Sequence, residues 1–409
     1  NSLYFTQGDS TLVNGKAIKA TLETSQLIDN QPISVNCKLN TDKLNLAYTN
    51  MRANVDASNI EAYMKVNPSD ENYTPTLRGN FELVDTKASM DSMQVELQNP
   101  RGAFQIEPQG SNNSGLQVKL DFNDNKLFFA NGESLQLSTN EIGLNLAMKE
   151  NSDKEDFLVK WNPIVKVKLN DGNVDLGGFK EFIKIPAINF DYNNQEFDIH
   201  SSKIILGNSD FSLKGKIQNI GEWLDNTGLL EGALDFVSDN TDFNEIIDLT
   251  SGLGQSPDAE NSTESIMSTE VENAEDDPFI VPRGVDLVLN TQINNAVLGE
   301  QTMRNLGGRL HIKDGVLVLE EMGFISRAAK MQLTGIYRTP RRNHLYLGLD
   351  FHMTNIQIEE LIKMVPEIDT ILPMITSFKG KAEFHFAVET YMKSNYDFKM
   401  STLRGAASV

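Results

Sequence analysis

The sequence predicts a mainly β protein, built from antiparallel strands with a few short helices. Polar and apolar residues alternate along most of the chain, glycine-containing turn signals interrupt this alternation roughly every 8 to 12 residues, and helical periodicity is scarce. Successive side chains of a strand point to opposite faces. Each alternating run therefore describes a strand with one apolar and one polar face.

The alternation recurs from one end of the chain to the other. Its clearest runs cover residues 116–122, 165–169, 188–192, 285–293, 345–353 and 384–388. Turn signals in which glycine supplies a positive φ separate the runs. They include Asn14-Gly15, Asp171-Gly172, Gly177-Gly178 and Asp314-Gly315. Short turns between alternating runs predict antiparallel meanders.

Three segments have helical features. Asp242 with Glu245 three residues later resembles a capping box and precedes an apolar run. Thr354 with Gln357 has the same spacing. A further short helical turn is predicted at 220–225. These helices are too short and too few to change the predicted fold class.

Two of these helices belong to an internal repeat. Residues 234–247 align without a gap with residues 349–362, and both segments begin with Leu-Asp-Phe. Upstream, residues 211–215 correspond to residues 331–335, and both segments end in glycine. The repeat predicts a module of a strand ending in glycine, a second strand and a short helix.

The repeat and a change in composition predict the domain organisation. Residues 1–254 form a strand-rich region, with the first repeat unit at about 160–254. Residues 255–277 are acidic, contain almost no large apolar residue and cannot bury enough surface to order themselves, so a flexible insertion is expected there. Residues 278–409 form the second repeat unit.

Charge and cysteine content exclude several classes of protein. The chain has 57 acidic and 36 basic residues, a formal charge of -21, so its field repels phosphate backbones and no nucleic-acid partner is expected. The single Cys37 excludes an intrachain disulfide and a CxxC redox motif. The chain contains no run of 18 apolar residues, so no membrane-spanning helix is predicted within it.

The sequence predicts no enzyme, no cofactor and no metal site. The histidines show no HxxxH or HExxH spacing, and the chain has no P-loop, GxGxxG or GxSxG motif. His311, His352 and His385 occupy polar positions of alternating strands. They are expected to face solvent. The apolar stripes then remain as the widespread feature, and alternation alone favours the ordinary core of a β-sandwich.

Several segments together resemble a known family. They are Gly207–Gly215, Gly232–Ser238 with the helix after it, Asn305–Leu310, Lys313–Leu319 and Gly335. Their order, two strands joined by a turn glycine, a strand ending in glycine and a strand leading to a short helix, resembles the C-terminal region of AsmA-family proteins, which include the TamB-like proteins. The resemblance covers about residues 160–409. It consists of turn glycines, apolar residues and helix caps.

The resemblance implies an elongated, twisted antiparallel sheet of repeating strand-rich modules, curled into a groove. It implies a periplasmic protein, anchored to the inner membrane by an N-terminal helix absent from this sequence. Phospholipid would move along the groove for outer-membrane biogenesis. The implied partners are phospholipid, the membranes at the two ends of the full-length protein, and outer-membrane assembly factors.

One set of residues is expected to line this groove. It comprises Leu287, Leu289, Ile293, Leu310, Ile312, Leu347, Leu349, Phe351, Phe384, Phe386 and Val388. The alternative is a scaffold or interaction module that binds no lipid and assists outer-membrane assembly.

Overall fold

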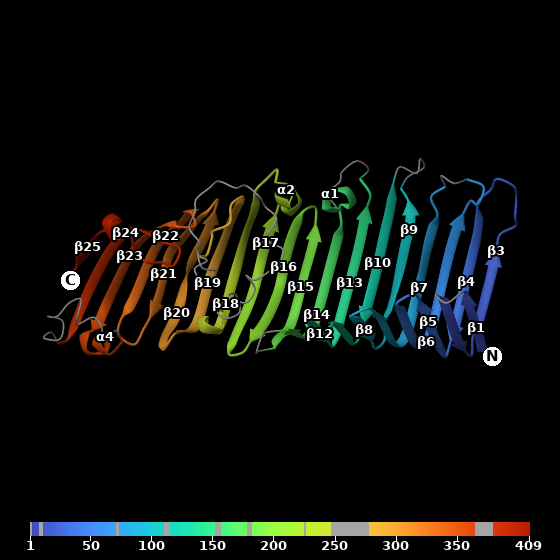
Figure 1. The fold of residues 1–409 in the computed structure, drawn as a ribbon, viewed down its shortest axis with the longest axis horizontal. Helices are drawn as coiled ribbons and strands as arrows, with labels where there is room; N and C mark the ends of the chain where they lie inside the picture. The colour runs from blue at the N-terminus through green and yellow to red at the C-terminus, as the bar shows by residue number, and fades with distance from the viewer. Residues whose placement is uncertain are drawn as a thin grey trace, which may run out of the picture. The chain divides into compact units, whose positions relative to one another are not determined.

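The structure, a computed structural model, confirms the predicted fold class. The chain is mainly β, with 71% of its described residues in strands and 7% in helices (Figure 1). The described residues are 2–7, 11–70, 73–109, 115–151, 157–177, 182–224, 226–246, 278–364 and 379–409. The expected acidic insertion at 255–277 lies outside them. Among them, no helix is long and apolar enough to cross a membrane.

The chain divides into two compact units, Asn1–Ile205 and Leu206–Val409. This division falls inside the segment expected to form the first repeat unit. The strands of that segment before Leu206 therefore belong to the first compact unit, and its later strands belong to the second compact unit together with the second repeat unit. Each unit contains a β-sheet.

The first unit contains one short helix, α1 (Phe157–Trp161), among its described residues. Its strands are β1 (Ser2–Gln7), β2 (Thr11–Lys16), β3 (Lys19–Thr24), β4 (Ile33–Thr41), β5 (Lys43–Tyr48), β6 (Met51–Val66), β7 (Thr76–Met90), β8 (Met93–Leu97), β9 (Arg101–Pro108), β10 (Leu116–Asp124), β11 (Leu127–Asn131), β12 (Leu135–Thr139), β13 (Glu141–Lys149), β14 (Ile164–Leu176), β15 (Ile183–Asn193) and β16 (Glu196–Leu206), which ends at the boundary.

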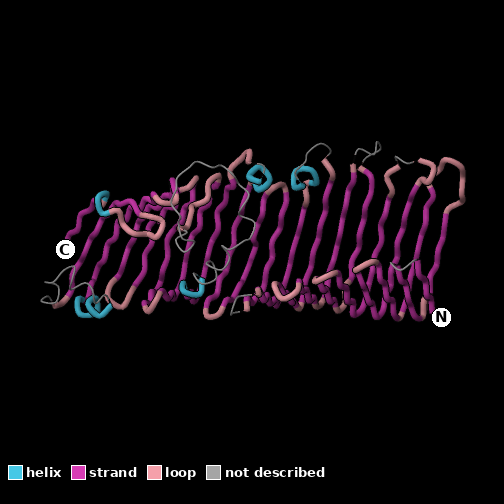
Figure 2. Tube along the Cα trace, in the orientation of Figure 1, coloured by secondary structure: helices cyan, strands magenta, loops and turns pink. Residues whose placement is uncertain are grey.

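Long strands of this unit each pair with two short ones. Strand β6 pairs with β5 along one half and with β4 along the other. Strand β7 pairs in the same way with β8 and β9, and β14 with β12 and β13. The short strands β5, β8 and β12 lie along the lower edge of this unit in Figures 1 and 2. The sheet is therefore creased along the line where the short strands meet.

The alternation of apolar residues shifts by one position at this crease. In β7 the apolar residues are odd-numbered before Asp85 and even-numbered after it, and Asp85 has a φ of 41°. In β14 the same shift occurs at Asp171, with a φ of 52°. An extra residue reverses the side to which the following side chains point. The shift in sequence therefore keeps apolar side chains on one face on both sides of the crease.

Buried polar groups hold the crease together. The Asp124 side chain is 2% exposed, and its carboxylate accepts hydrogen bonds from the backbone N–H groups of Gln98, Asn99 and Asn125 at 3.3, 2.8 and 2.9 Å. Other buried polar residues near the crease are Thr41, Ser58, Thr86 and Thr139. All of them share the face of the apolar side chains. Burial at a fold marks its inner side, so the apolar face is the inner face of the crease.

The second unit contains, in its described part, helices α2 (Ile220–Leu224) and α4 (Ile358–Met364) and the 3-10 helix η2 (Met400–Thr402). Its strands are β17 (Ser209–Gln218), β18 (Leu230–Asp242), β19 (Val285–Leu298), β20 (Gln301–Lys313), β21 (Val316–Ile325), β22 (Lys330–Arg341), β23 (His344–Gln357), β24 (Lys381–Met392) and β25 (Arg404–Ser408).

One pair of strands in this unit is parallel, which corrects the expectation of a purely antiparallel sheet. Strands β18 and β19 pair in parallel from Leu230 with Val285 to Asp242 with Val297. Strand β19 begins at the same end of the sheet as β18, so the two strands run in the same direction. The other neighbouring pairs described in this unit are antiparallel.

The internal repeat is visible as a common order of elements. Strands β17 and β18 are followed by a helical turn at 243–246, and strands β22 and β23 are followed by α4. The predicted short helix at 220–225 corresponds to α2. The predicted capping box at Thr354 is wrong in position, because β23 continues to Gln357 and α4 begins at Ile358.

The capping box at Asp242 forms only in part. The Asp242 carboxylate accepts the N–H of Asn244 at 2.9 Å, as an N-cap does. The carboxylate of Glu245 instead accepts the N–H of Asn208 and the hydroxyl of Ser209. Glu245 thus connects the helical turn to the start of β17 rather than closing its own helix.

Similar turn signals have three different outcomes. Asp314 and Gly315, with φ of 44° and 80°, form the predicted hairpin between β20 and β21. Asp171-Gly172 lies within β14 and forms the crease, and Asn14-Gly15 lies within β2. The prediction of a turn at these two dipeptides is wrong.

Replacement of the buried carboxylate at the crease should destabilise the first unit. We expect Asp124→Ala to lower the free energy of unfolding by about 3 kcal/mol, because three buried N–H groups lose a charged acceptor. Asp124→Asn retains one side-chain oxygen and should cost about half as much. Urea denaturation followed by circular dichroism measures both values. The exposed Asp121→Ala is the control, and equal stability of D124A and D121A would contradict the assigned role of Asp124.

Candidate functional site

The residues expected to line a groove share one face of the second unit and lie in rows across its strands. One row runs through Leu234, Leu289, Leu310, Leu319, Gly335, Leu349 and Val388. The row beside it runs through Leu287, Ile312, Leu317, Tyr337, Leu347 and Thr390. Further along the strands lie the rows Leu333, Phe351, Phe386 and Phe324, Met331, Met353, Phe384. We call these four rows the apolar face.

The apolar face is half-buried in its middle rows. Of the predicted lining residues, all except Ile293 have intermediate exposure. The inner face of a β-sandwich is instead covered by a second sheet. Among the described residues of this unit, therefore, the apolar face is not sealed as in a sandwich.

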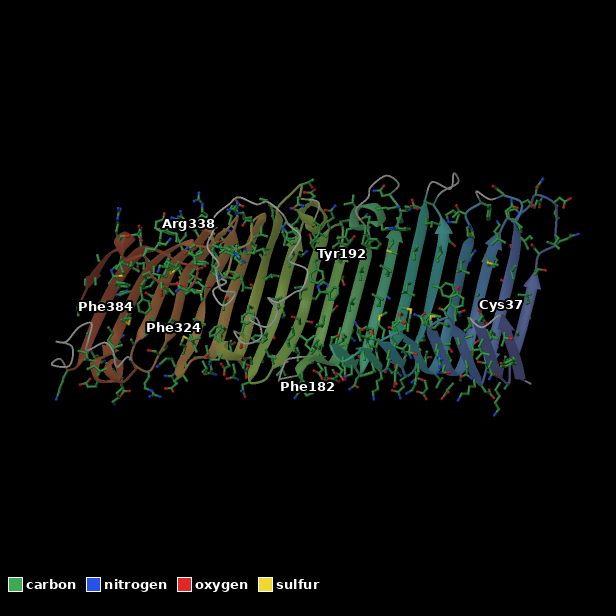
Figure 3. The ribbon with its side chains drawn as sticks, in the orientation of Figure 1. Cys37, Phe182, Tyr192, Phe324, Arg338 and Phe384 are labelled. Carbon is green, nitrogen blue, oxygen red and sulfur yellow. The ribbon has the colours of Figure 1, made fainter. Side chains whose placement is uncertain are left out.

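Ile293 lies in a buried cluster rather than on the half-buried rows. It is 2% exposed and packs with Ala296, Leu306 and Met322. A second cluster covers the neighbouring strand ends, where Ile356 and the α4 residue Leu361 pack against residues of β22 and β23. These clusters close the lower end of the apolar face, where Figure 3 labels Phe324 and Phe384.

A short segment borders the opposite end of the apolar face. In this segment, residues 278–282, which we call the strap, the N–H of Phe279 donates to the Tyr396 hydroxyl at 2.8 Å. The Tyr337 hydroxyl donates to the Phe279 carbonyl at 2.9 Å, and the two rings stack with centroids 6.5 Å apart. The N–H of Val281 donates to the Thr339 hydroxyl at 3.0 Å. The strap is thus fixed to β22 and to the loop after β24.

The contact with the strap changes the acidity of Tyr337. Burial of the phenol, together with the neighbouring Tyr396 hydroxyl, raises the pKa of Tyr337 from 10.0 to about 12. A phenol that stays protonated keeps donating its hydrogen bond to the strap. This hydrogen bond therefore persists to a higher pH than the ordinary pKa of a tyrosine would allow.

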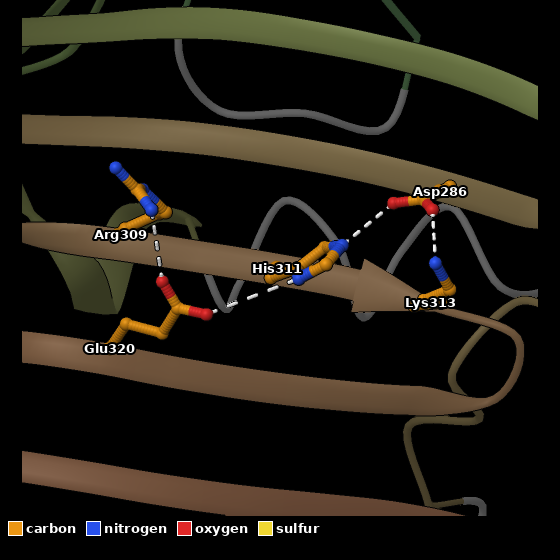
Figure 4. Close-up of polar contacts among 5 residues, drawn as sticks. All are labelled: Asp286, Arg309, His311, Lys313 and Glu320. Carbon is orange, nitrogen blue, oxygen red and sulfur yellow. Dashed lines mark hydrogen bonds and ion pairs between the residues drawn. The ribbon is translucent and has the colours of Figure 1, made fainter.

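The opposite face of the same strands is polar and carries ion pairs (Figure 4). One Asp286 oxygen lies 2.7 Å from His311 Nε2, and the other accepts a hydrogen bond from Lys313 Nζ at 2.6 Å. Glu320 pairs with Arg309 at 3.2 Å and lies 4.0 Å from His311 Nδ1. The hydrogen bonds from Lys313 and His311 hold the pKa of Asp286 below its usual value.

The predicted histidines are on this polar face, yet each has a carboxylate partner. His352 Nε2 lies 2.6 Å from Glu383, and His385 Nε2 lies 3.0 Å from Asp350. The expectation that they simply face solvent is therefore incomplete. In the described part of the chain, no group of three or more His, Cys, Asp or Glu residues could hold a metal ion.

A hollow of about 840 Å³ lies in the first unit, lined by both polar and apolar side chains. Two of its cations already have partners: Lys38 forms an ion pair with Glu61 at 2.9 Å, and the Arg78 guanidinium lies 4.7 Å from the Tyr63 ring centroid. Most of the exposed lining of the hollow is nevertheless apolar, so the hollow also suits an apolar ligand.

The acidity of Tyr337 predicts a dependence of stability on pH. Its pKa is raised by folding, so its contribution is complete below pH 10 and is lost as the pH rises from 10 to 12. We expect a loss of about 1 kcal/mol over that range, after allowance for solvent screening. Urea denaturation at several alkaline pH values measures it. Tyr337→Phe should flatten this dependence, whereas the exposed control Tyr48→Phe should leave it unchanged; equal slopes for both variants would refute the assignment.

Sequence alternation located the apolar face but not the strap or the crease. The strap has no periodicity of its own, and Phe279 contacts Tyr396, which is 117 residues away in sequence. The crease could have been found from the shift of apolar positions at Asp85 and Asp171.

The chain matches no protein-family model, and comparisons with curated proteins and with solved structures find no similar protein. The geometry of the apolar face is consequently the basis for assigning a function.

Proposed function

We propose that the protein binds the acyl chains of phospholipid along its apolar face. One observation supports this above all: rows of half-buried apolar side chains continue across the hydrogen-bonded strands from β18 to β24. Monomeric proteins rarely leave a large continuous apolar surface exposed unless it binds a partner or ligand. A hydrocarbon chain is the ligand whose chemistry matches such a surface.

The energetics favour this ligand. Each CH₂ group removed from water contributes about 0.8 kcal/mol, so a 16-carbon chain gains roughly 12 kcal/mol at most. The hydrophobic effect has no preferred direction. A chain can therefore slide from one row to the next without breaking specific bonds, which suits transport better than tight retention.

The middle of the apolar face has a smooth surface. At Gly335, a Cβ atom would lie 2.9 Å from a methyl group of Leu349 and 3.3 Å from one of Leu319. The two leucines thus extend over the glycine and fill the space of its missing side chain. Nearby, Phe384 and Phe386 stack with ring centroids 6.3 Å apart. Such a surface offers contact along its length.

The wider role in this proposal follows the resemblance to AsmA-family proteins. In that role the protein would be anchored to the inner membrane and would conduct phospholipid through the periplasm for outer-membrane biogenesis. The repeated order of strand, strand and helix and the apolar inner face support the resemblance. The alternative role is a scaffold for outer-membrane assembly that carries no lipid.

A pair of neighbouring substitutions on β24 tests lipid binding. Phe386→Lys places a charge on the apolar face, and we expect it to lower the uptake of a fluorescent phospholipid at least tenfold, because the charge must be desolvated by the acyl chain. Ala387→Lys is the matched control. Ala387 lies next to Phe386 on the polar face and opposite Asp350, so the new charge gains a partner.

Native mass spectrometry of the purified protein gives the second readout. Bound phospholipid in the unaltered protein and in A387K, with loss in F386K, is the expected result. Absence of lipid from all three proteins, with no uptake of added lipid, would exclude the proposal and leave the scaffold. Equal uptake by F386K and A387K would show that lipid binds elsewhere.

A further inference from the structure

One end of the sheet in the second unit exposes a group of large apolar side chains. The loops at this end comprise the described residues 218–224, 226–230, 278–284, 314–315, 338–344 and 393–404, which lie together because they adjoin the ends of paired strands. We call them the upper rim, the uppermost edge of this unit in Figure 1. Its exposed apolar residues are Trp223, Leu224, Leu229, Phe279, Ile280, Tyr396, Phe398, Met400 and Leu403.

The same rim is rich in basic residues, although the chain as a whole has a charge of -21. Arg338, labelled in Figure 3, lies at this edge. The basic residues at or next to the rim are Arg283, Lys313, Arg338, Arg341, Arg342, Lys393, Lys399 and Arg404, whereas the described acidic residues at or next to it are Glu222, Glu231, Asp314 and Asp397. Lys313 is paired with Asp286. Among the described residues, Arg283, Arg341 and Lys393 form no ion pair with a carboxylate.

Hydrogen bonds hold the apolar side chains of two rim loops together. The bond from Phe279 N–H to the Tyr396 hydroxyl connects the strap to the loop after β24. In that loop, Lys399 Nζ donates to the Asn343 carbonyl of the loop between β22 and β23. The exposed rings therefore project from a fixed base rather than from independent loops, so their burial by a ligand requires little ordering of the chain.

Aromatic and basic side chains on one edge match the chemistry of a membrane surface. Tryptophan and tyrosine favour the headgroup region because they have an apolar body and a polar group. Arginine and lysine are attracted by anionic headgroups. A duplex nucleic acid keeps its bases stacked inside and offers no apolar region for Phe398 or Met400, and the charge of the whole chain repels it.

We infer that the upper rim docks on a membrane that carries anionic lipid headgroups. Phe398, Met400 and the strap ring enter the headgroup region, and Arg341 and Lys393 contact headgroup phosphates. This inference is independent of acyl-chain binding on the apolar face. A protein that docks at the rim and carries no lipid would still satisfy it.

The position of Trp223 on the rim allows a direct test. The chain has two tryptophans, so Trp161→Phe leaves Trp223 as the single reporter. We expect its emission to shift to shorter wavelength when vesicles of phosphatidylcholine with about one third phosphatidylglycerol are added. The shift should be much smaller with pure phosphatidylcholine vesicles and should decrease as salt is added. An unchanged emission with anionic vesicles at low salt would overturn the inference.

Substitutions in flotation assays separate the two contributions. Each of Arg341→Gln and Lys393→Gln should weaken binding to anionic vesicles about fivefold. The double variant Phe398→Ser, Met400→Ser should weaken it at least tenfold. The matched controls in the first unit are Arg52→Gln for charge and Leu22→Ser with Leu27→Ser for exposed apolar residues.

Unchanged circular dichroism and an unchanged midpoint of thermal unfolding establish that the rim variants are folded. Vesicle binding by the rim variants that equals binding by the controls would overturn the inference. Binding of the unaltered protein to duplex DNA but not to anionic vesicles would also overturn it, and would assign the rim to a different polyanion.

Discussion

The structure depends on one constraint, which is that successive side chains of a strand must point to opposite faces. A strand that bends sharply would lose its apolar face unless its pattern also changed. At Asp85 and Asp171 the left-handed backbone and the one-residue shift occur together, and the apolar residues remain on the inner side. In the second unit, Asn305 and Glu321 have the same backbone conformation at corresponding shifts. The pattern of apolar residues in each strand therefore determines the inner apolar face of that strand separately.

Polar groups contribute differently at the crease and at the strap. At the crease of the first unit, the Asp124 carboxylate fixes backbone groups that the bend removes from the ladder. At the strap, the phenols of Tyr337 and Tyr396 bind a backbone segment that belongs to no strand. On the outer face, exposed ion pairs such as Arg309 with Glu320 contribute little to stability. Their main effect is to keep the outer face solvated.

The sequence was sufficient for the fold class and for the membership of the apolar face, because both follow from local period-two patterns. Phe351 and Phe386 could be assigned to one side without knowledge of their neighbours, and the structure pairs them directly. Asp171-Gly172 and Asp314-Gly315 carry the same turn signal, yet one creases a strand and the other ends it. The partner strands decide between these outcomes, and a single sequence does not reveal the partners. For the same reason, the strap and the parallel pairing of β18 with β19 could not be predicted from the sequence.

The parallel pair β18–β19 has a consequence for how such a sheet can grow. Backbone hydrogen bonds join the two strands in register, from Leu230 to Asp242, and the apolar row passes from Leu234 to Leu289 without interruption. A duplicated module inserted at such a junction would meet an edge that any strand of matching pattern can extend. Each added pair of strands would lengthen the row by about 10 Å. Length could thus evolve by tandem duplication, independently of surface chemistry.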